Sequence, residues 1–177
     1  SDLERAGEGA GGPRMSINAV PEIIYGFIER QRARTPERPA LIGVAGAQGS
    51  GKTTAVQLLE AANRPRFAQF SIDDVYLDRD QRAAMAARTH PLFVTRGPPG
   101  THDIALARAT IDALTAASPE TETPLPRFDK IADFMKPRAE WPVFRGRPEA
   151  ILVDAWCLGA LPTPVGSPLN EVEAQDT

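Results

Sequence analysis

Three segments of the chain repeat apolar residues at the spacing of a helix. The first follows Pro21, the second begins at Lys52, and the third follows Thr101, which is the expected N-cap. Each pattern gathers apolar side chains on one face, which predicts an amphipathic helix packed against a core. The predicted inward-facing residues are Ile23, Ile24, Phe27 and Ile28 in the first helix, Ala55, Val56 and Leu59 in the second, and Ile104, Ala107, Ile111 and Leu114 in the third.

Three other segments are short, apolar and bounded by turn residues, as strands buried in a parallel sheet are. They are ALIGVA at 40–45, the apolar start of RFAQFSIDDVYL at 66–77, and AILVDAW at 150–156. Strands that alternate with helices in this way favour the α/β class. The sequence therefore predicts a parallel sheet with helices on both faces.

Composition narrows the range of functions. The chain has 177 residues, 42% of them hydrophobic, which suits one domain; we expect a flexible tail over residues 1–16 and the domain over residues 17–177. The net charge is −3 and the basic residues are scattered, so we expect no nucleic-acid partner. No apolar run approaches the ~20 residues that span a bilayer, so we expect no membrane partner. The single cysteine, Cys157, suits a reducing cytoplasm.

A glycine-rich loop, AGAQGSGKTT, joins the first strand to the second helix. Its spacing fits G-x-x-x-x-G-K-[ST], in which backbone N–H groups at the start of a helix surround phosphate groups. Lys52 would reach the outer phosphates of a nucleotide and Thr53 would be a ligand of Mg²⁺. The predicted nucleotide-binding residues are Gly46, Ala47, Gln48, Gly49, Ser50, Gly51, Lys52, Thr53 and Thr54.

Carboxylates follow the second and third predicted strands. Asp73 and Asp74 come at the end of the second, where one of them could accept a proton from a substrate hydroxyl; the alternative is a helix cap or a solvated turn. Asp154 ends the third strand, where an acid could hold Mg²⁺ directly or through water.

Two further stretches combine prolines with charged residues and have no regular period. They are HPLFVTRGPPGTHD at 90–103 and TPLPRFDKIADFMKPRAEWP at 123–142. This composition predicts rigid, shaped loops that line a site. The alternative is that they are connecting loops with surface charges.

Taken together, these blocks resemble D-glycerate 3-kinase and its bacterial relatives, within the wider uridine kinase and phosphoribulokinase group. The resemblance runs from about residue 42 to residue 173, and the TRGPPGTHD and PRFDK blocks are its most specific parts. It implies a phosphate-loop kinase that uses ATP and Mg²⁺ to phosphorylate a hydroxyl of a small organic acid, with D-glycerate favoured. The alternatives are another acceptor, such as a nucleoside, a sugar acid or a pantothenate-like alcohol, or a nucleotide-binding module without turnover.

The resemblance also implies roles for individual residues. Asp73 matches the acid that serves as the base in the wider group. Lys52, which would contact the phosphates, is the other predicted catalytic residue. A carboxylate acceptor needs a cation, which Arg96, Arg127 or Lys130 could supply. The residues expected to line the acceptor pocket are Tyr76, His90, Arg96, His102, Asp103, Arg127, Asp129 and Lys130.

The chain departs from the family pattern in two places. Asp154-Ala155-Trp156 stands where the family has Glu-Gly-Trp. Related kinases also continue beyond the PLNEVE block with further strands and a lid, so we expect a domain truncated at its C-terminus. Strand 40–45 would then lie at a sheet edge, an aggregation hazard unless a missing segment, a second copy of the chain or the Pro21 helix covers it.

Overall fold

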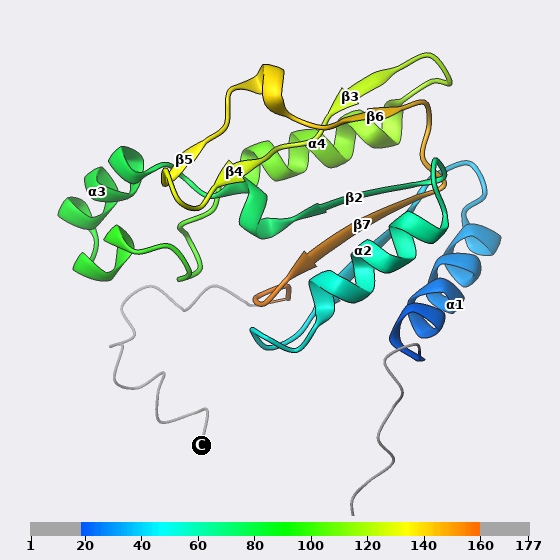
Figure 1. Ribbon diagram of the computed structural model, residues 1–177, viewed down its shortest axis with the longest axis horizontal. Helices are drawn as coiled ribbons and strands as arrows, with labels where there is room; N and C mark the ends of the chain where they lie inside the picture. Colours follow the sequence, from blue (N-terminus) through cyan, green and yellow to red (C-terminus); the bar gives the residue numbers. More distant parts are fainter. Residues whose placement is uncertain (1–18, 160–177) are drawn as a thin grey trace, which may run out of the picture.

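The computed structural model describes residues 19–159, so the predicted tail and the PLNEVE block lie outside the described residues. Helices and strands alternate as the sequence predicts, and Figure 1 shows their arrangement. In chain order the elements are α1 (Ala19–Arg34), β1 (Ala40–Ala45), α2 (Lys52–Ala62), β2 (Phe67–Ser71), η1 (Ile72–Val75), α3 (Arg79–Arg88), η2 (Pro91–Val94), α4 (Ile104–Ala116), β3 (Glu122–Pro124), β4 (Phe128–Asp129), β5 (Phe134–Met135), η3 (Arg138–Glu140), β6 (Val143–Arg145) and β7 (Ala150–Ala155), where η marks a 3-10 helix.

The three predicted strands form one parallel sheet in the order β1-β7-β2. In the register of this sheet, Asp154 of β7 lies opposite Val44 of β1 and Ser71 of β2. All three strands therefore end at the same edge, and the loops that follow them meet there. This common edge brings the glycine loop, the aspartate pair and Asp154 together.

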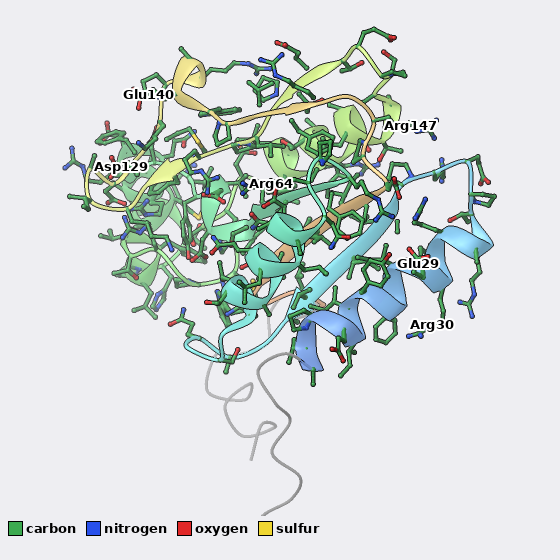
Figure 2. The ribbon with its side chains drawn as sticks, turned by 45° about the vertical axis from the view of Figure 1, so that its right-hand side comes forward. Glu29, Arg30, Arg64, Asp129, Glu140 and Arg147 are labelled. Carbon is green, nitrogen blue, oxygen red and sulfur yellow. The ribbon has the colours of Figure 1, made fainter. Side chains whose placement is uncertain are left out.

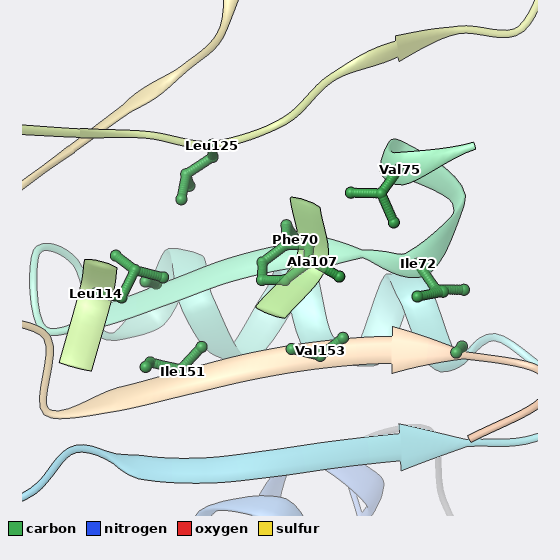
Figure 3. Close-up of a cluster of buried hydrophobic side chains, with 10 residues drawn as sticks. Phe70, Ile72, Val75, Ala107, Leu114, Leu125, Ile151 and Val153 are labelled. Atoms are coloured by element: carbon green, nitrogen blue, oxygen red, sulfur yellow. The ribbon is translucent and has the colours of Figure 1, made fainter. Parts of the chain in front are cut away.

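Helices cover both faces of this sheet, as predicted. On one face, α1 and α2 pack on it through a cluster that includes Ile28, Val56 and Leu152. On the other face, α4 packs through a cluster of Phe70, Leu114, Ile151 and neighbours, drawn in Figure 3. Because alternate residues of β7 point to opposite faces, Ile151 and Leu152 belong to different clusters.

Strand β1 is the edge of this sheet within residues 19–159, as expected from the resemblance. It is not fully buried: Leu41 is 49% exposed, and every second residue of the strand is exposed. Helix α1 packs on the other face through Ile24 and Ile28, while Ile23 and Phe27 are exposed, so their predicted inward orientation is wrong. What covers the free edge of β1 stays a prediction.

The second predicted shaped loop contains short strands that its proline-rich sequence conceals. Strands β3 and β6 pair antiparallel, as do β4 and β5, and the β4–β5 turn projects toward the phosphate loop. The first, at 90–103, contains only η2.

Two predictions about α4 are wrong. Its N-cap is Asp103, whose Oδ1 accepts from the N–H of Leu106 at 2.9 Å. The hydroxyl of Thr101 donates instead to the carbonyl of Pro98 at 2.7 Å, so it is engaged in the preceding turn. Ile104, in the first turn, is 60% exposed rather than inward-facing.

Candidate functional site

The glycine loop joins β1 to α2, and two of its glycines have positive φ angles. Gly49 and Gly51 have φ values of 76° and 81°, in the left-handed region where side chains are strained. Helix α2 starts directly afterwards, so its free N–H groups point toward the loop. The ammonium of Lys52 folds back across the loop and donates to the carbonyl of Ala47 at 3.2 Å.

Asp154 is the centre of a polar cluster at the end of β7. Its carboxylate is 1% exposed and accepts three side-chain hydrogen bonds: from Thr53 at 2.7 Å, from Gln69 at 3.1 Å and from Ser71 at 3.2 Å. Ser71 and Gln69, which the sequence reasoning missed, come from β2 and enclose the carboxylate. The cluster joins the phosphate loop to the sheet.

Two side chains of this cluster, those of Thr53 and Asp154, suit Mg²⁺. Within residues 19–159 no group of three or more acidic, histidine or cysteine side chains could form a metal cage. Mg²⁺ needs few protein ligands when phosphates and water supply the others. The Thr53 hydroxyl and the buried Asp154 carboxylate, 2.7 Å apart, can be those few ligands. Thr53 and Asp154 therefore fit the ion.

The two aspartates of η1 lie in different environments. The Asp74 carboxylate accepts from the N–H of Ser71 at 3.0 Å, as part of a capping box, and from Arg127 at 3.2 Å. Burial raises the pKa of Asp74. These contacts give Asp74 the cap role that the sequence left open for the pair.

Asp73 faces the phosphate loop. Its Oδ1 accepts from the hydroxyl of Tyr76 at 3.0 Å and its Oδ2 from the ammonium of Lys130 at 2.7 Å. Burial by itself would raise the pKa of the Asp73 carboxyl. The hydrogen bond and charge of Lys130, together with the Tyr76 bond, outweigh burial, so the pKa lies below its ordinary value.

A cavity of about 390 Å³ joins these groups to the phosphate loop. A second cavity of about 450 Å³ continues on the other side of the Asp73–Lys130 pair and shares Thr53, Ser71, Asp73 and Lys130 with the first. The predicted site residues that line the first cavity are Gln48, Gly49, Lys52, Thr53, Asp73, Tyr76, Arg96, Lys130 and Asp154. The second is lined also by Arg127 and Asp129.

The remaining predicted acceptor residues have local structural contacts. His102 stacks on Tyr76 with ring centroids 4.4 Å apart, is 6% exposed, and has its pKa lowered by burial. Its Nε2 is buried with no hydrogen-bond partner. His90 caps η2 through Nδ1, and Asp103 caps α4. The Asp129 carboxylate accepts from two N–H groups of the β4–β5 turn, at Ile131 and Ala132; Figure 2 labels it.

An ion-pair network that the sequence reasoning missed supports the acceptor side of the cavity. Asp133, at φ 61°, accepts from Arg82 and from Arg96, each at 2.6 Å. Arg82 is 2% exposed and also donates to the carbonyls of Leu77 and Val94. Nothing in the spacing of these residues indicates the network, because Arg82 and Asp133 are 51 positions apart.

Comparison with known proteins agrees with this geometry. No protein-family model matches the chain. A D-glycerate 3-kinase from Cryptococcus neoformans superposes with a TM-score of 0.67 at 24% identity, covering 90% of this chain and 57% of that one. The chain has the fold of the P-loop kinases. The YGR205w protein superposes with a TM-score of 0.68 at 23% identity, covering 85% of this chain and 56% of that one.

A relative in sequence is also named as a kinase. The uncharacterized kinase mug58 of Schizosaccharomyces pombe is 32% identical over 120 residues, which are 65% of this chain and 43% of that protein. The chain thus spans about half the length of the proteins it matches. The predicted resemblance to the D-glycerate 3-kinase group is confirmed. The solved structures show this resemblance in the fold. Across the described residues, no helix has the length and hydropathy needed to cross a membrane.

Proposed function

We propose that the chain transfers the terminal phosphoryl group of ATP to a hydroxyl of a small organic acid, with D-glycerate as the favoured acceptor. The observation that carries the proposal is one cavity of about 390 Å³ that holds both the phosphate loop and a carboxylate suited to a base. A phosphoryl donor and a hydroxyl acceptor can meet in such a cavity, with Lys52 and Asp73 on its wall.

The loop side of the cavity would bind the nucleotide. Backbone N–H groups of residues 46–54 would surround the phosphates, and Lys52 would turn from the Ala47 carbonyl to the outer phosphates. Thr53 and Asp154 would hold Mg²⁺, Asp154 through water because its carboxylate already accepts three side-chain hydrogen bonds. When bound, that ion neutralises charge on the phosphates.

The opposite side of the cavity would activate the acceptor. The Asp73 carboxylate would accept the proton of the acceptor hydroxyl while that oxygen attacks the phosphorus. Tyr76 donates to one oxygen of Asp73 and thereby fixes its orientation. Asp74 is a poorer candidate for the base, since it is 8% exposed and pairs with Arg127.

The charge of the cavity favours an anionic acceptor. Arg96 and Lys130 lie on its wall, opposite the phosphate loop, and either can meet a carboxylate of the substrate. The name of the Cryptococcus protein, a D-glycerate 3-kinase, supports glycerate as the first acceptor to test. A nucleoside, another sugar acid or a pantothenate-like alcohol would use the same loop and base with different pocket contacts.

The experiment is a panel of acceptor alcohols scored by ADP release with ATP and Mg²⁺. We expect D-glycerate to give the highest kcat/KM of the panel and the Lys52→Ala variant to give almost no release. Highest turnover with another acceptor would reassign the substrate and leave the kinase proposal standing. ATP binding without acceptor-dependent release from any alcohol would instead indicate a nucleotide-binding module without turnover.

A further inference from the structure

The ammonium of Lys130 is hydrogen-bonded to Asp73, the proposed base. Lys130 lies in the turn between β4 and β5, and its Nζ donates to Oδ2 of Asp73 at 2.7 Å. The lysine side chain is 56% exposed and that of Asp73 is 34% exposed, so solvent and small solutes can reach the pair. Lys130 also lines both cavities, which meet at this ion pair.

The other cations near the acceptor side are held by carboxylates that are not the base. Arg96 donates to Asp133 at 2.6 Å and to the carbonyl of Lys130 at 2.9 Å. Arg127 donates to Asp74. Lys130 therefore differs from both arginines: a substrate that draws its ammonium away changes the state of Asp73 directly.

Both oxygens of Asp73 already have a donor. Tyr76 donates to Oδ1, and the Lys130 ammonium donates to Oδ2. A hydroxyl that approaches Oδ2 must share that oxygen with a full positive charge, which lowers its ability to take a proton. The pair in this arrangement is a resting state of the base.

We propose that Lys130 is a specificity-determining latch on Asp73, which the carboxylate of an acidic acceptor releases by taking the Lys130 ammonium for itself. This inference rests on the proposed phosphoryl transfer. The ammonium exchanges one carboxylate partner for another, so the exchange loses no ion pair. A neutral polyol offers no carboxylate and leaves the latch closed.

The released Oδ2 then receives the acceptor hydroxyl. As the O–H bond breaks, its proton passes to Asp73, the hydroxyl oxygen forms a bond to the terminal phosphorus of ATP, and the bond from that phosphorus to the ADP oxygen breaks. One residue would thus couple recognition of the acid to activation of the base. The preference for acids would appear in catalysis as well as in binding.

The test compares D-glycerate with glycerol, which lacks the carboxylate, in wild type and Lys130→Ala. We expect the variant to lower kcat/KM for D-glycerate by about 100-fold, the loss of one charge-assisted bond, and to raise kcat/KM for glycerol a few-fold because the latch is gone. Calorimetry of D-glycerate binding in the presence of a non-hydrolysable ATP analogue should give a weaker Kd for the variant.

Two controls bracket the result. Arg108→Ala removes an exposed cation that pairs with Asp112 at 3.9 Å and lines neither cavity, so the glycerate-to-glycerol ratio should stay as in wild type. Lys130→Gln keeps a hydrogen-bond donor without the charge and should lose the ratio as the alanine does. Thermal melts identify any variant that fails to fold.

The outcomes separate this inference from the function on which it rests. If wild type phosphorylates D-glycerate and both Lys130 variants keep its glycerate-to-glycerol ratio, the latch is refuted while the proposed function stands. A fall in turnover with both acceptors by the same factor also refutes the latch. Such a fall would mean that Lys130 supports catalysis in general and does not set the preference for acids. Absence of acceptor-dependent turnover in wild type overturns the proposed function and the latch together.

Discussion

The two sides of the central cavity are built in different ways. The phosphate side comes mainly from one run of nine residues, 46–54, which forms the loop after β1 and the first turn of α2, with Asp154 added from the end of β7. The acceptor side comes from η1, the segment before α4 and the β4–β5 turn, which are up to about 60 positions apart in the chain. The phosphate side therefore depends on local backbone conformation, and the acceptor side depends on contacts between distant segments.

These two constructions respond differently to mutation. On the phosphate side the donors are mostly backbone N–H groups, which no side-chain change removes, and Lys52 is the main charged side chain. On the acceptor side the segments are joined by the ion pairs of Asp73, Asp74 and Asp133. We therefore expect loss of Lys52 to have the largest effect on turnover, and changes on the acceptor side to alter acceptor-dependent turnover, acceptor affinity and pH dependence.

The largest effect should follow Lys52→Ala. Loss of the charge that neutralises the migrating phosphoryl group should reduce kcat by about 10³-fold, a magnitude typical for a group acting on transition-state charge. The fold should stay intact, because among residues 19–159 the ammonium hydrogen-bonds only to the Ala47 carbonyl. ADP release and a thermal melt measure the two effects; near-normal turnover in the folded variant would contradict the phosphate-loop assignment.

Asp73→Asn should come next, with acceptor-dependent turnover lowered by about 100-fold and ATP affinity unchanged. Asp74→Asn is the matched control one residue away. Its carboxylate caps η1 and pairs with Arg127, so its loss should lower the free energy of unfolding by about 1 kcal/mol with a smaller effect on turnover. The reverse assignment of the two phenotypes would make Asp74 the base.

The sequence alone predicts the phosphate side well, because each of its signals lies within a few residues of the next. The strand 40–45, the glycine spacing and the helix from Lys52 all appear as expected, and a buried acid after apolar residues locates Asp154. The same local information predicts the parallel sheet. It does not predict the exposed face of β1, since exposure depends on which segments pack over the strand.

The acceptor side is less predictable because its contacts span long intervals. The sequence indicates that Arg96, Arg127 or Lys130 could hold the acceptor carboxylate and does not rank the three. The Arg82–Asp133–Arg96 network escaped it, since a buried arginine in a polar helix carries no distinguishing local pattern. His90 and Asp103 were expected in the pocket, and both side chains are engaged as caps.

The Asp133→Ala variant tests whether that network supports the acceptor side. Arg82 is 2% exposed, and removing its partner leaves a buried charge, so we expect a loss of about 3 kcal/mol in the free energy of unfolding. Arg96 would also lose its anchor, which should raise KM for the acceptor by about 10-fold, the loss of one such contact.

KM for ATP should not change in the folded Asp133→Ala protein, since the side-chain partners of Asp133 are Arg82 and Arg96, outside residues 46–54. The exposed pair of Arg108 and Asp112 supplies a matched control: Asp112→Ala should alter neither constant. A parallel rise in both KM values would show that Asp133 supports the whole domain instead of the acceptor side.

The smallest expected effect is a shift of the pH profile on the acceptor side. Burial raises the pKa of Asp73, but Lys130 and Tyr76 lower it further than burial raises it, so the base of the free enzyme stays ionised to a lower pH than an ordinary aspartate. His102 also faces Asp73, and burial lowers the pKa of its imidazole. Removal of the Lys130 charge in Lys130→Ala favours the protonated carboxyl and must raise the Asp73 pKa. The acidic limb of kcat/KM for D-glycerate should therefore move up by about one pH unit in this variant, while Arg108→Ala leaves it in place. ATP binding measured over the same pH range should not shift in the variant, because Lys130 lies outside the phosphate loop at residues 46–54. A limb that stays fixed in Lys130→Ala, or that moves equally for ATP binding, would mean that the two sides of the cavity are not electrostatically distinct.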